Sequence, residues 1–324
     1  MTDAMRALVV DATGEDARLR MGEVPRPLRV SDEALVRVVA AGINPIDRKT
    51  KLGRGVSAAI PSFPAVLGQD FAGIVEQVPY AAHPLQVGDR VYGMGRVPRT
   101  SGSYAEFVSV SSLSVAPMPA AVGFVEAAAV PCAALTAWGA VVDVARAHDG
   151  QRMLVHAGAG GVGHFAVQLA NYFGAHVTAT ASPRNAEFLS SLGAHRVIDY
   201  TSERFEDVLG EQDVVIDLVG NAADDTGSRS LRVLRRGGLV VNVPTGSWPT
   251  MAEEAAAAGV RATGYSVPPD GRTLSVISRL IDDGSIRVHV DGEYPLEEGE
   301  AAHRLLGEGH VRGKLVLRVA PDPA

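Results

Sequence analysis

Six consecutive residues form a pattern that is typical of phosphate binding. Gly158, Gly160 and Gly163 have the spacing G-x-G-x-x-G within the run Gly158-Ala159-Gly160-Gly161-Val162-Gly163. The run follows a predicted strand at 152–157 and opens a helical pattern at 161–175. The first glycine then allows a tight turn, the second lets a pyrophosphate approach, and the third lets helix and strand pack closely. The helix amides face the phosphates. We interpret all six residues as a dinucleotide-binding loop; the alternative is a loop whose glycines serve turn geometry alone.

The residues after the next predicted strand indicate which dinucleotide binds. An NAD site carries an acid here, about twenty residues beyond the glycine run, which holds the ribose hydroxyls. This chain has Ser182, Arg184 and Asn185 instead, and its first acid is Glu187. The three side chains offer hydrogen-bond donors to a 2′-phosphate, which a carboxylate would repel. The expected cofactor is therefore NADPH. The alternative for Arg184 is a solvated arginine in the first turn of a helix.

Two different residue patterns along the sequence predict two kinds of domain. Over the first ~115 residues, short β-rich runs such as 33–43 alternate with Gly, Pro and Asp clusters, which is typical of an irregular all-β domain. From residue 126, apolar runs of strand length alternate with helical patterns, which predicts βαβ units around a parallel sheet. We therefore expect an α/β fold. The expected elements include helices over 127–142 and 224–238 and strands over 260–267 and 286–290.

The composition favours a two-domain globular protein. The chain has 324 residues, of which 46% are hydrophobic, and a net charge of -7. It is long enough for two cores and lacks the basic balance expected of a nucleic-acid-binding protein. The longest apolar stretch, 127–142, contains Pro131 and falls short of the roughly 18 residues of a membrane-spanning helix. A single cysteine, Cys132, and a start without a long apolar region predict a cytoplasmic protein without membrane or nucleic-acid partners.

Besides the glycine run, the chain contains the ordered segments DEALVRVVAAGINPIDRKTKLG, FPAVLGQDFAGIVEQV, VGDRVYG, GSYAEFV, AAAVPCAALTAW, TASPRNAEFLSSLGA, SLGAHRVIDY and HVRGKLVL. Together they resemble the medium-chain dehydrogenase/reductase superfamily, in particular its zinc-free quinone oxidoreductase branch and the alkenal and oxoene reductases within it. The resemblance covers nearly the full length. It implies a GroES-like β domain from residues 1–125 and 268–324 and a Rossmann domain, a doubly wound parallel sheet, inserted at 126–267.

The resemblance also bears on metal binding. Where the zinc alcohol dehydrogenases carry a cysteine ligand, the matching residue is Asn44, and where they carry Gly-His-Glu, this chain has Gly68-Gln69-Asp70. Cys132 alone stands where a third ligand would be, and one soft ligand cannot hold zinc. The nine histidines show no metal-binding spacing and are interpreted as surface or strand-edge residues. We therefore expect no metal site.

Hydride transfer to an electron-poor acceptor is the chemistry expected without a metal ion. A quinone, or an alkene conjugated to a carbonyl, spreads the incoming charge onto oxygen, so it needs a nearby nicotinamide and a hydrogen-bond donor. Pro45 directs Asn44 into an extended conformation, and the resemblance places Asn44 and Asp47 beside nicotinamide and substrate. Both are catalytic candidates, although Asp47 has helix capping as its alternative. No tyrosine follows as an acid, so the proton comes from solvent, from the cofactor ribose or, as a weaker alternative, from Tyr104.

Further cofactor contacts are expected after later strands. Val243 and Thr245 follow the fifth Rossmann strand, at the carboxyl edge where doubly wound sheets bind ligands. Val219 and Lys314 complete the expected cofactor-binding set. The predicted strand 260–267 lies at the edge of the Rossmann sheet, where it is expected to pair with its copy in a homodimer.

Other functions stay open at this stage. A biosynthetic enoyl reductase would act on a carrier-bound thioester, although the sequence has neither a basic docking patch nor the tyrosine. An NADPH-binding sensor or structural protein would bind the cofactor without oxidising it in response to an acceptor. A retained alcohol dehydrogenase activity would require a metal ion.

Overall fold

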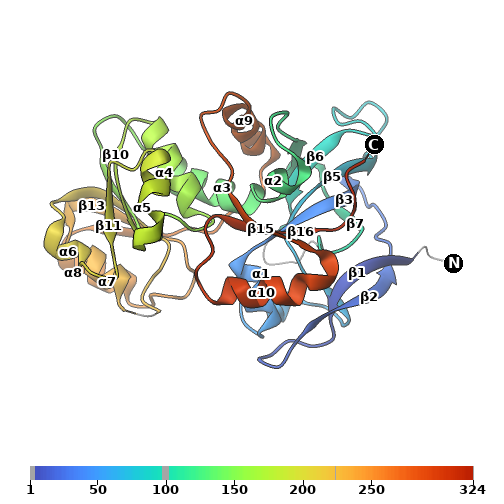
Figure 1. Ribbon diagram of the computed structural model, residues 1–324, viewed down its shortest axis with the longest axis horizontal. Coiled ribbons are helices and arrows are strands. Elements are labelled where there is room, and N and C mark those ends of the chain that lie inside the picture. The colour runs from blue at the N-terminus through green and yellow to red at the C-terminus, as the bar shows by residue number, and fades with distance from the viewer. Residues whose placement is uncertain (1–3, 97–101, 223, 324) are drawn as a thin grey trace. The chain divides into compact units, whose positions relative to one another are not determined.

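The structure is a computed structural model that describes residues 4–96, 102–222 and 224–323. The chain divides into two compact units (Figure 1). Unit 1 comprises Met1–Leu135, Pro268–Gly284 and Val288–Ala324, and unit 2 comprises Thr136–Val267 and Ser285–Arg287. Unit 2 is therefore an insertion in the sequence of unit 1. Among the described residues, no helix is both long enough and apolar enough to span a membrane.

Unit 1 is built on β-sheet. Within the described residues, its larger sheet has seven strands in the order β15-β16-β3-β5-β6-β8, and β7 also pairs with β3. The pairs are antiparallel except for the parallel β15 and β16. A smaller sheet has the order β2-β1-β4. The bounds are β1 Ala4–Val10, β2 Leu19–Pro25, β3 Glu33–Ile43, β4 Ala65–Val66, β5 Asp70–Gln77, β6 Arg90–Met94, β7 Phe107–Ser111, β8 Val115–Pro117, β15 Val290–Pro295 and β16 Lys314–Arg318.

Short helices join these strands. The helices of unit 1 are α1 Pro45–Lys51, α2 Phe124–Ala128, α9 Gly271–Asp282 and α10 Gly299–Gly307, with 3₁₀ turns η1 Ser57–Ala59, η2 Ser112–Ser114 and η5 Leu296–Glu298. Helix α9 begins after Asp270, whose carboxylate accepts hydrogen bonds from the first-turn amides of Arg272 and Thr273. Helices α1 and α10 lie side by side (Figure 1). Helix α3, Pro131–Trp138, runs from unit 1 into unit 2.

Unit 2 is a doubly wound α/β domain. Its described part forms a six-stranded parallel sheet in the order β11-β10-β9-β12-β13-β14. Numbered from the first strand of the unit, this is the order 3-2-1-4-5-6, which reverses direction between β9 and β12. The bounds are β9 Arg152–Val155, β10 His176–Ala181, β11 Arg196–Asp199, β12 Gln212–Asp217, β13 Leu234–Asn242 and β14 Arg261–Gly264. The sheet therefore provides a switch point at its carboxyl edge, where ligands bind.

Helices cover both faces of this sheet. Figure 1 shows α4 Gly163–Tyr172 and α5 Ala186–Ser191 on one side, and α6 Phe205–Val208, α7 Thr226–Ser230 and α8 Met251–Ala258 on the other. The second group buries Phe205, Leu231 and Trp248 against Leu154 and Val240 of the sheet. The remaining elements are a π-helical turn, η3 Gly139–Val144, and a 3₁₀ turn, η4 Pro183–Asn185.

A parallel doubly wound sheet in one unit and a separate β-sheet unit confirm the expected fold class. Three predicted elements differ from the structure. The apolar stretch 127–142 is divided among α2, α3 and η3, because Pro131 lacks the N–H that a continuous helix would use. The helix expected at 224–238 is shorter in the structure, where it is α7, and residues from 234 onward belong to β13. The prediction of a strand at 286–290 is wrong, because the strand of this region is β15, which pairs with β16.

Helix α2 and strand β3 approach so closely that a side chain would not fit between them. A Cβ atom on Gly42 of β3 would lie 2.2 Å from the carbonyl oxygen of Ala128 and 3.0 Å from the Cβ of Asp70. The contact matters for the site, because Gly42 lies two residues before Asn44.

We predict that Gly42→Ala lowers the midpoint of thermal unfolding by several degrees, because α2 must move away from β3 at a cost of about 1–3 kcal/mol. Circular dichroism melting measures it. Gly210→Ala is the control, because a Cβ at Gly210 would meet no atom within 4 Å. Equal melting of the two variants would contradict this packing.

Candidate active site

The glycine run lies where the carboxyl end of β9 leads into α4. A Cβ on Gly163 would lie 2.2 Å from the carbonyl oxygen of Ala157, and one on Gly158 would lie 2.9 Å from the Cβ of Ala179. Packing within unit 2 thus requires glycine at both positions. Gly160 differs, because its Cβ would meet only the oxygen of Ala157, at 3.3 Å. The absence of a side chain at Gly160 therefore leaves open space above the loop, as the approach of a pyrophosphate requires. The loop fits a dinucleotide.

The other loop residues divide by exposure. Ala159 is buried, whereas residues 160–162 are half-buried and form the accessible part of the loop. Ser182, Arg184 and Asn185 lie together at the carboxyl end of β10, the neighbouring strand. The amide nitrogen Nδ2 of Asn185 donates a hydrogen bond to Ser182 Oγ at 3.2 Å. Arg184 is exposed between them. The structure thus brings the three residues expected at the 2′-phosphate to one place.

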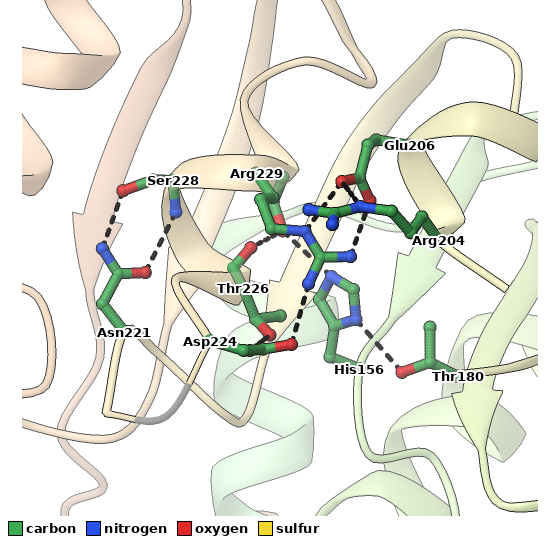
Figure 2. Close-up of polar contacts among 10 residues, drawn as sticks. His156, Thr180, Arg204, Glu206, Asn221, Asp224, Thr226, Ser228 and Arg229 are labelled. Carbon is green, nitrogen blue, oxygen red and sulfur yellow. Dashed lines mark hydrogen bonds and ion pairs between the residues drawn. The ribbon is translucent and has the colours of Figure 1, made fainter. Parts of the chain in front are cut away.

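A buried histidine supports the loop from below. Figure 2 shows His156, which directly follows β9, beside Thr180 of β10, and the other ring nitrogen of His156 faces Ser230 of α7. Its Nδ1 is 3.1 Å from Thr180 Oγ1, and its Nε2 is 2.9 Å from Ser230 Oγ. Because Ser230 donates its own proton to the carbonyl of Thr226 at 2.7 Å, Nε2 must be the protonated nitrogen. His156 thus joins β9, β10 and α7.

Charged residues fix the neighbouring helices. Figure 2 shows Arg229 of α7 between Glu206 of α6 and Asp224. Arg229 contacts a carboxylate oxygen of Glu206 at 2.7 Å and one of Asp224 at 2.8 Å. The hydrogen bonds from Arg229 lower the pKa of Glu206 to about 2.

Burial lowers the pKa of His156 to about 4, so this histidine is neutral at pH 7. The expectation that the histidines are surface or strand-edge residues is wrong for His156, His164 and His303, which are buried.

A buried carboxylate holds the loops after β12 and β13. Asp217, the last residue of β12, accepts hydrogen bonds from the backbone N–H groups of Val219 at 2.9 Å and Gly220 at 2.8 Å. It also accepts one from Asn242 Nδ2 at the end of β13, at 2.7 Å. Asp217 thereby fixes the segments that carry the predicted cofactor contacts. Val219 and Val243 are half-buried, and Thr245 is exposed.

Asp217 and Asn242 are not among the site residues predicted from the sequence. Both are polar residues at the carboxyl ends of apolar parallel strands, and that position is the signal that would have identified them. Trp248, beyond the same edge, is 5% exposed and packs in the hydrophobic core, with its ring N–H donating to Glu254.

Asn44 and Asp47 lie at the start of α1 in unit 1. Asn44 is extended, with φ −122° and ψ 152°, as the following proline requires. Asp47 Oδ2 accepts hydrogen bonds from the backbone N–H of Asn44 at 2.9 Å and from the hydroxyl of Tyr104 at 3.0 Å. The Tyr104 hydroxyl also lies 3.1 Å from Nε2 of His303. Asp47 therefore supports the first turn of α1 and also orders a tyrosine and a histidine distant in sequence.

Burial governs the protonation states of Asp47 and His303. Asp47 is 2% exposed, and burial raises its pKa to about 7 against the opposing hydrogen bonds from Asn44 and Tyr104; the nearby Asp70 raises it further. Burial lowers the pKa of His303 to about 3, so its ring is neutral. Asp47 thus changes its protonation state near neutral pH.

A lysine lies among the residues that match zinc ligands. Asn44 Nδ2 donates to Asp70 Oδ2 at 2.9 Å, and the backbone N–H of Cys132 donates to Asp70 Oδ1 at 2.9 Å. The ammonium of Lys314 donates to Asn44 Oδ1 at 2.5 Å and to the carbonyl of Ile43 at 2.8 Å, and lies 3.6 Å from Asp70 Oδ2. Burial raises the pKa of Asp70, and Lys314 opposes that rise. The expected contact of Lys314 with the cofactor stays a prediction.

This donor set does not fit zinc. The oxygens of Asn44 and Asp70 face an ammonium, which is itself a cation that would repel a metal ion. The amides of Asn44 and Gln69 also stand where the zinc alcohol dehydrogenases carry the thiolate and the imidazole that zinc prefers. Among residues 4–96, 102–222 and 224–323, no three His, Cys, Asp or Glu side chains form a group that could hold a metal ion.

Two protein families match the sequence. The family described as alcohol dehydrogenase GroES-like domain matches residues 30–120, and the family described as zinc-binding dehydrogenase matches residues 192–317. The chain is 36% identical to 2-methylene-furan-3-one reductase of Solanum lycopersicum over 90% of this chain and 72% of that protein. It is 33% identical to NADPH-dependent alkenal/one oxidoreductase, chloroplastic, of Arabidopsis thaliana, over 96% of this chain and 78% of that protein. The match to the GroES-like family lies within unit 1 and agrees with the GroES-like β domain expected there.

A solved structure agrees with these matches. The quinone oxidoreductase from Coxiella burnetii superposes with a TM-score of 0.91 at 36% sequence identity, over 98% of this chain and 100% of that chain. The similarity thus extends over both units.

We predict that Gly160→Ala weakens NADPH binding at least about tenfold, because its methyl group occupies the space left for the pyrophosphate. Isothermal titration calorimetry measures the dissociation constant. The thermal midpoint of Gly160→Ala should stay close to that of the wild type, whereas Gly163→Ala should lower it because its Cβ meets the oxygen of Ala157. Unchanged affinity in Gly160→Ala would remove the phosphate role of the loop.

We also predict that His156→Gln reduces the loss of stability in acid. The pKa of His156 is about 4 in the folded protein and near 6.5 when unfolded, so only the unfolded chain takes up this proton between those values. Wild-type stability therefore falls by about 3 kcal/mol from this residue as the pH drops from 6.5 to 4. Urea unfolding of both proteins at pH 7 and pH 4.5 gives the difference. Parallel losses in the two proteins would show that His156 does not contribute it.

Proposed function

The chain belongs to the medium-chain dehydrogenase/reductase superfamily, and from this premise we propose that it is an NADPH-dependent reductase of quinones or of alkenes conjugated to a carbonyl group. The observation that carries the proposal is a doubly wound sheet with a glycine loop in a chain where Asn44, at the position of a zinc-binding cysteine, contacts a lysine ammonium. A nicotinamide cofactor supplies the hydride when it is bound. The acceptor must then be one that needs no metal ion to take it.

The choice of NADPH rests on the end of β10. Ser182, Arg184 and Asn185 are adjacent there, and no carboxylate among them would repel a 2′-phosphate. The relative from Arabidopsis thaliana is named as NADPH-dependent, which supports the same choice. Residues 158–163 would hold the pyrophosphate, and the loops carrying Val219, Val243 and Thr245 would hold the nicotinamide end.

The choice of acceptor rests on the buried polar residues Asn44, Asp47 and Asp70 of unit 1. An enone or quinone that receives hydride develops negative charge on its oxygen, and a fixed hydrogen-bond donor stabilises that charge. Asn44 is such a donor, because its Nδ2 carries two hydrogens and Asp70 accepts one of them. Asp47 orders this donor through its hydrogen bond with the Asn44 backbone. The relatives reported above are named as a 2-methylene-furan-3-one reductase, an alkenal/one oxidoreductase and a quinone oxidoreductase, which supports this class of acceptor.

The assembly proposed for this enzyme is a homodimer. Strand β14 pairs with β13 and is the last strand in the order of its sheet, so its other edge can pair with a second copy. Sedimentation of the purified protein measures the mass, and a monomer at micromolar concentration would contradict the proposal. The proposed location is the cytoplasm.

The function is tested by following NADPH oxidation at 340 nm with 9,10-phenanthrenequinone, 1-octen-3-one, a crotonyl thioester and a simple ketone. Turnover with the quinone or the enone is the expected result. Preference for the thioester would instead identify an enoyl-thioester reductase. Tight NADPH binding without oxidation by any acceptor would identify a protein without turnover and overturn the proposal.

We predict that Arg184→Ala raises the KM for NADPH roughly ten- to a hundredfold, because a charged hydrogen bond to the 2′-phosphate is lost. The KM for NADH should change little, since NADH lacks that phosphate. Steady-state kinetics with both cofactors measures the two values. Arg279→Ala, which removes an exposed arginine from α9 of unit 1, controls for net charge. Equal effects of Arg184→Ala on both cofactors would contradict the phosphate contact.

A further inference from the structure

Three buried ionisable residues of unit 1 lie within one polar group, defined here as Asn44, Asp47, Asp70 and Lys314. Asp70 is 0% exposed, Asp47 2% and Lys314 4%. Ions transferred from water into a protein interior are strongly destabilised unless opposite charges and hydrogen bonds compensate them. Lys314 is the cation within this group, since its ammonium contacts Asn44 and lies near Asp70. Ionised carboxylates in this group therefore require the ammonium of Lys314 at its position.

Lys314 uses two of its hydrogens in hydrogen bonds and lies within ion-pair distance of Asp70. An ammonium has three N–H groups and no acceptor. One donates to the carbonyl oxygen of Ile43, one donates to Asn44 Oδ1, and the side facing Asp70 forms the ion pair. The lysine thus contacts the backbone and the side chain at the two positions that lead into α1.

These contacts determine the orientation of the Asn44 amide. Its Oδ1 faces an ammonium, which can only donate, and its Nδ2 faces the carboxylate of Asp70, which accepts. A rotation of the amide by 180° would place oxygen against carboxylate and N–H against ammonium. The two charges therefore exclude the flipped amide, and the second N–H of Nδ2 keeps one direction.

We propose that Lys314 is a positioning residue whose ammonium binds Asn44, the residue at the position of a zinc-binding cysteine, and fixes the Asn44 amide as a donor for the acceptor oxygen. This inference rests on the proposed function. In this proposal Lys314 acts through Asn44, and the cofactor contact expected from the sequence is not part of its role, because its ammonium faces Ile43, Asn44 and Asp70. The arrangement requires both the positive charge and the short reach of the ammonium to Oδ1, so a neutral side chain of similar length removes it.

Lys314→Met tests the role, with Lys51→Met as the matched control. Lys51 also carries a buried ammonium in unit 1, paired with Glu300 at 2.8 Å, but it has no contact with Asn44. Misplacing a donor group costs about a hundredfold in rate. We expect Lys314→Met to lower kcat for an enone about a hundredfold while the KM for NADPH stays within about twofold. Lys51→Met should lower the thermal midpoint and leave kcat within about twofold. Equal kcat losses in both variants would overturn the role.

A double-mutant cycle shows whether Lys314 acts through Asn44. In the Asn44→Ala background, the further change Lys314→Met should alter kcat by less than about twofold, because the group it orients is already absent. An undiminished hundredfold loss in that background would show a separate role for the lysine and overturn the proposal.

Loss of the ammonium can also unfold unit 1, because two buried carboxyls then lack a cation. Lys314→Met combined with Asp70→Asn removes one charge of each sign and keeps an oxygen at position 70. We expect this pair to fold and to remain slow, since Asn44 Oδ1 still lacks its donor. A wild-type rate in the pair would contradict the proposal.

A readout independent of turnover separates this inference from the proposed function. With [15N]asparagine-labelled protein, hydrogen exchange of the Asn44 side-chain amide should be at least about tenfold faster in Lys314→Met than in wild type. Equal exchange would overturn the positioning role even in an active enzyme. A wild type that no acceptor oxidises would overturn the proposed function, and the exchange rates would still decide the role of Lys314.

Discussion

The ammonium of Lys314, buried between the amide of Asn44 and the carboxylate of Asp70, is the interaction on which the arrangement of the polar residues around α1 depends. A charge in a protein interior needs compensating partners, so the position of one such ion constrains every polar group around it. Here the constraint extends from β16 to the end of β3, the start of α1 and the start of β5. The close packing of Gly42 against α2 keeps these segments in place.

Two buried polar side chains, His156 and Asp217, hold the loops at the edge of the sheet in unit 2. Beneath its glycine loop, His156 is neutral and connects three elements through hydrogen bonds with defined donors and acceptors. At the edge of the same sheet, Asp217 is buried and its oxygens accept backbone and amide N–H groups from two loops. In both cases a buried polar side chain fixes loops that are themselves partly exposed. A loop that must admit a ligand cannot be held by packing on its outer side, so its support comes from within the domain.

The sequence predicted the elements whose information is local. The strand at 33–43 and the glycine run were recognisable, because alternation and spacing act over a few residues. The helix expected at 224–238 was wrong because Leu234 pairs with Gln212 of β12, and that tertiary contact outweighs a helical pattern. The role of Lys314 was beyond local reasoning, since 270 residues separate it from Asn44. The buried histidines were misread for the same reason: Ser230, the partner of His156, lies 74 residues away.

Replacing a divalent metal by an ammonium changes which acceptors can react. A metal ion bonds directly to a carbonyl oxygen and draws charge onto itself, which is why a simple ketone can then accept hydride. The ammonium of Lys314 donates to Ile43 and Asn44, so in the proposed mechanism it would act on the acceptor only through the Asn44 amide. An amide N–H stabilises developing charge less than a metal ion does, and the acceptor must therefore delocalise much of that charge itself. Quinones and conjugated enones do so through their own π systems, whereas a simple ketone or aldehyde does not. The electron-poor character of the proposed substrates thus follows from the charge and the reach of one lysine side chain.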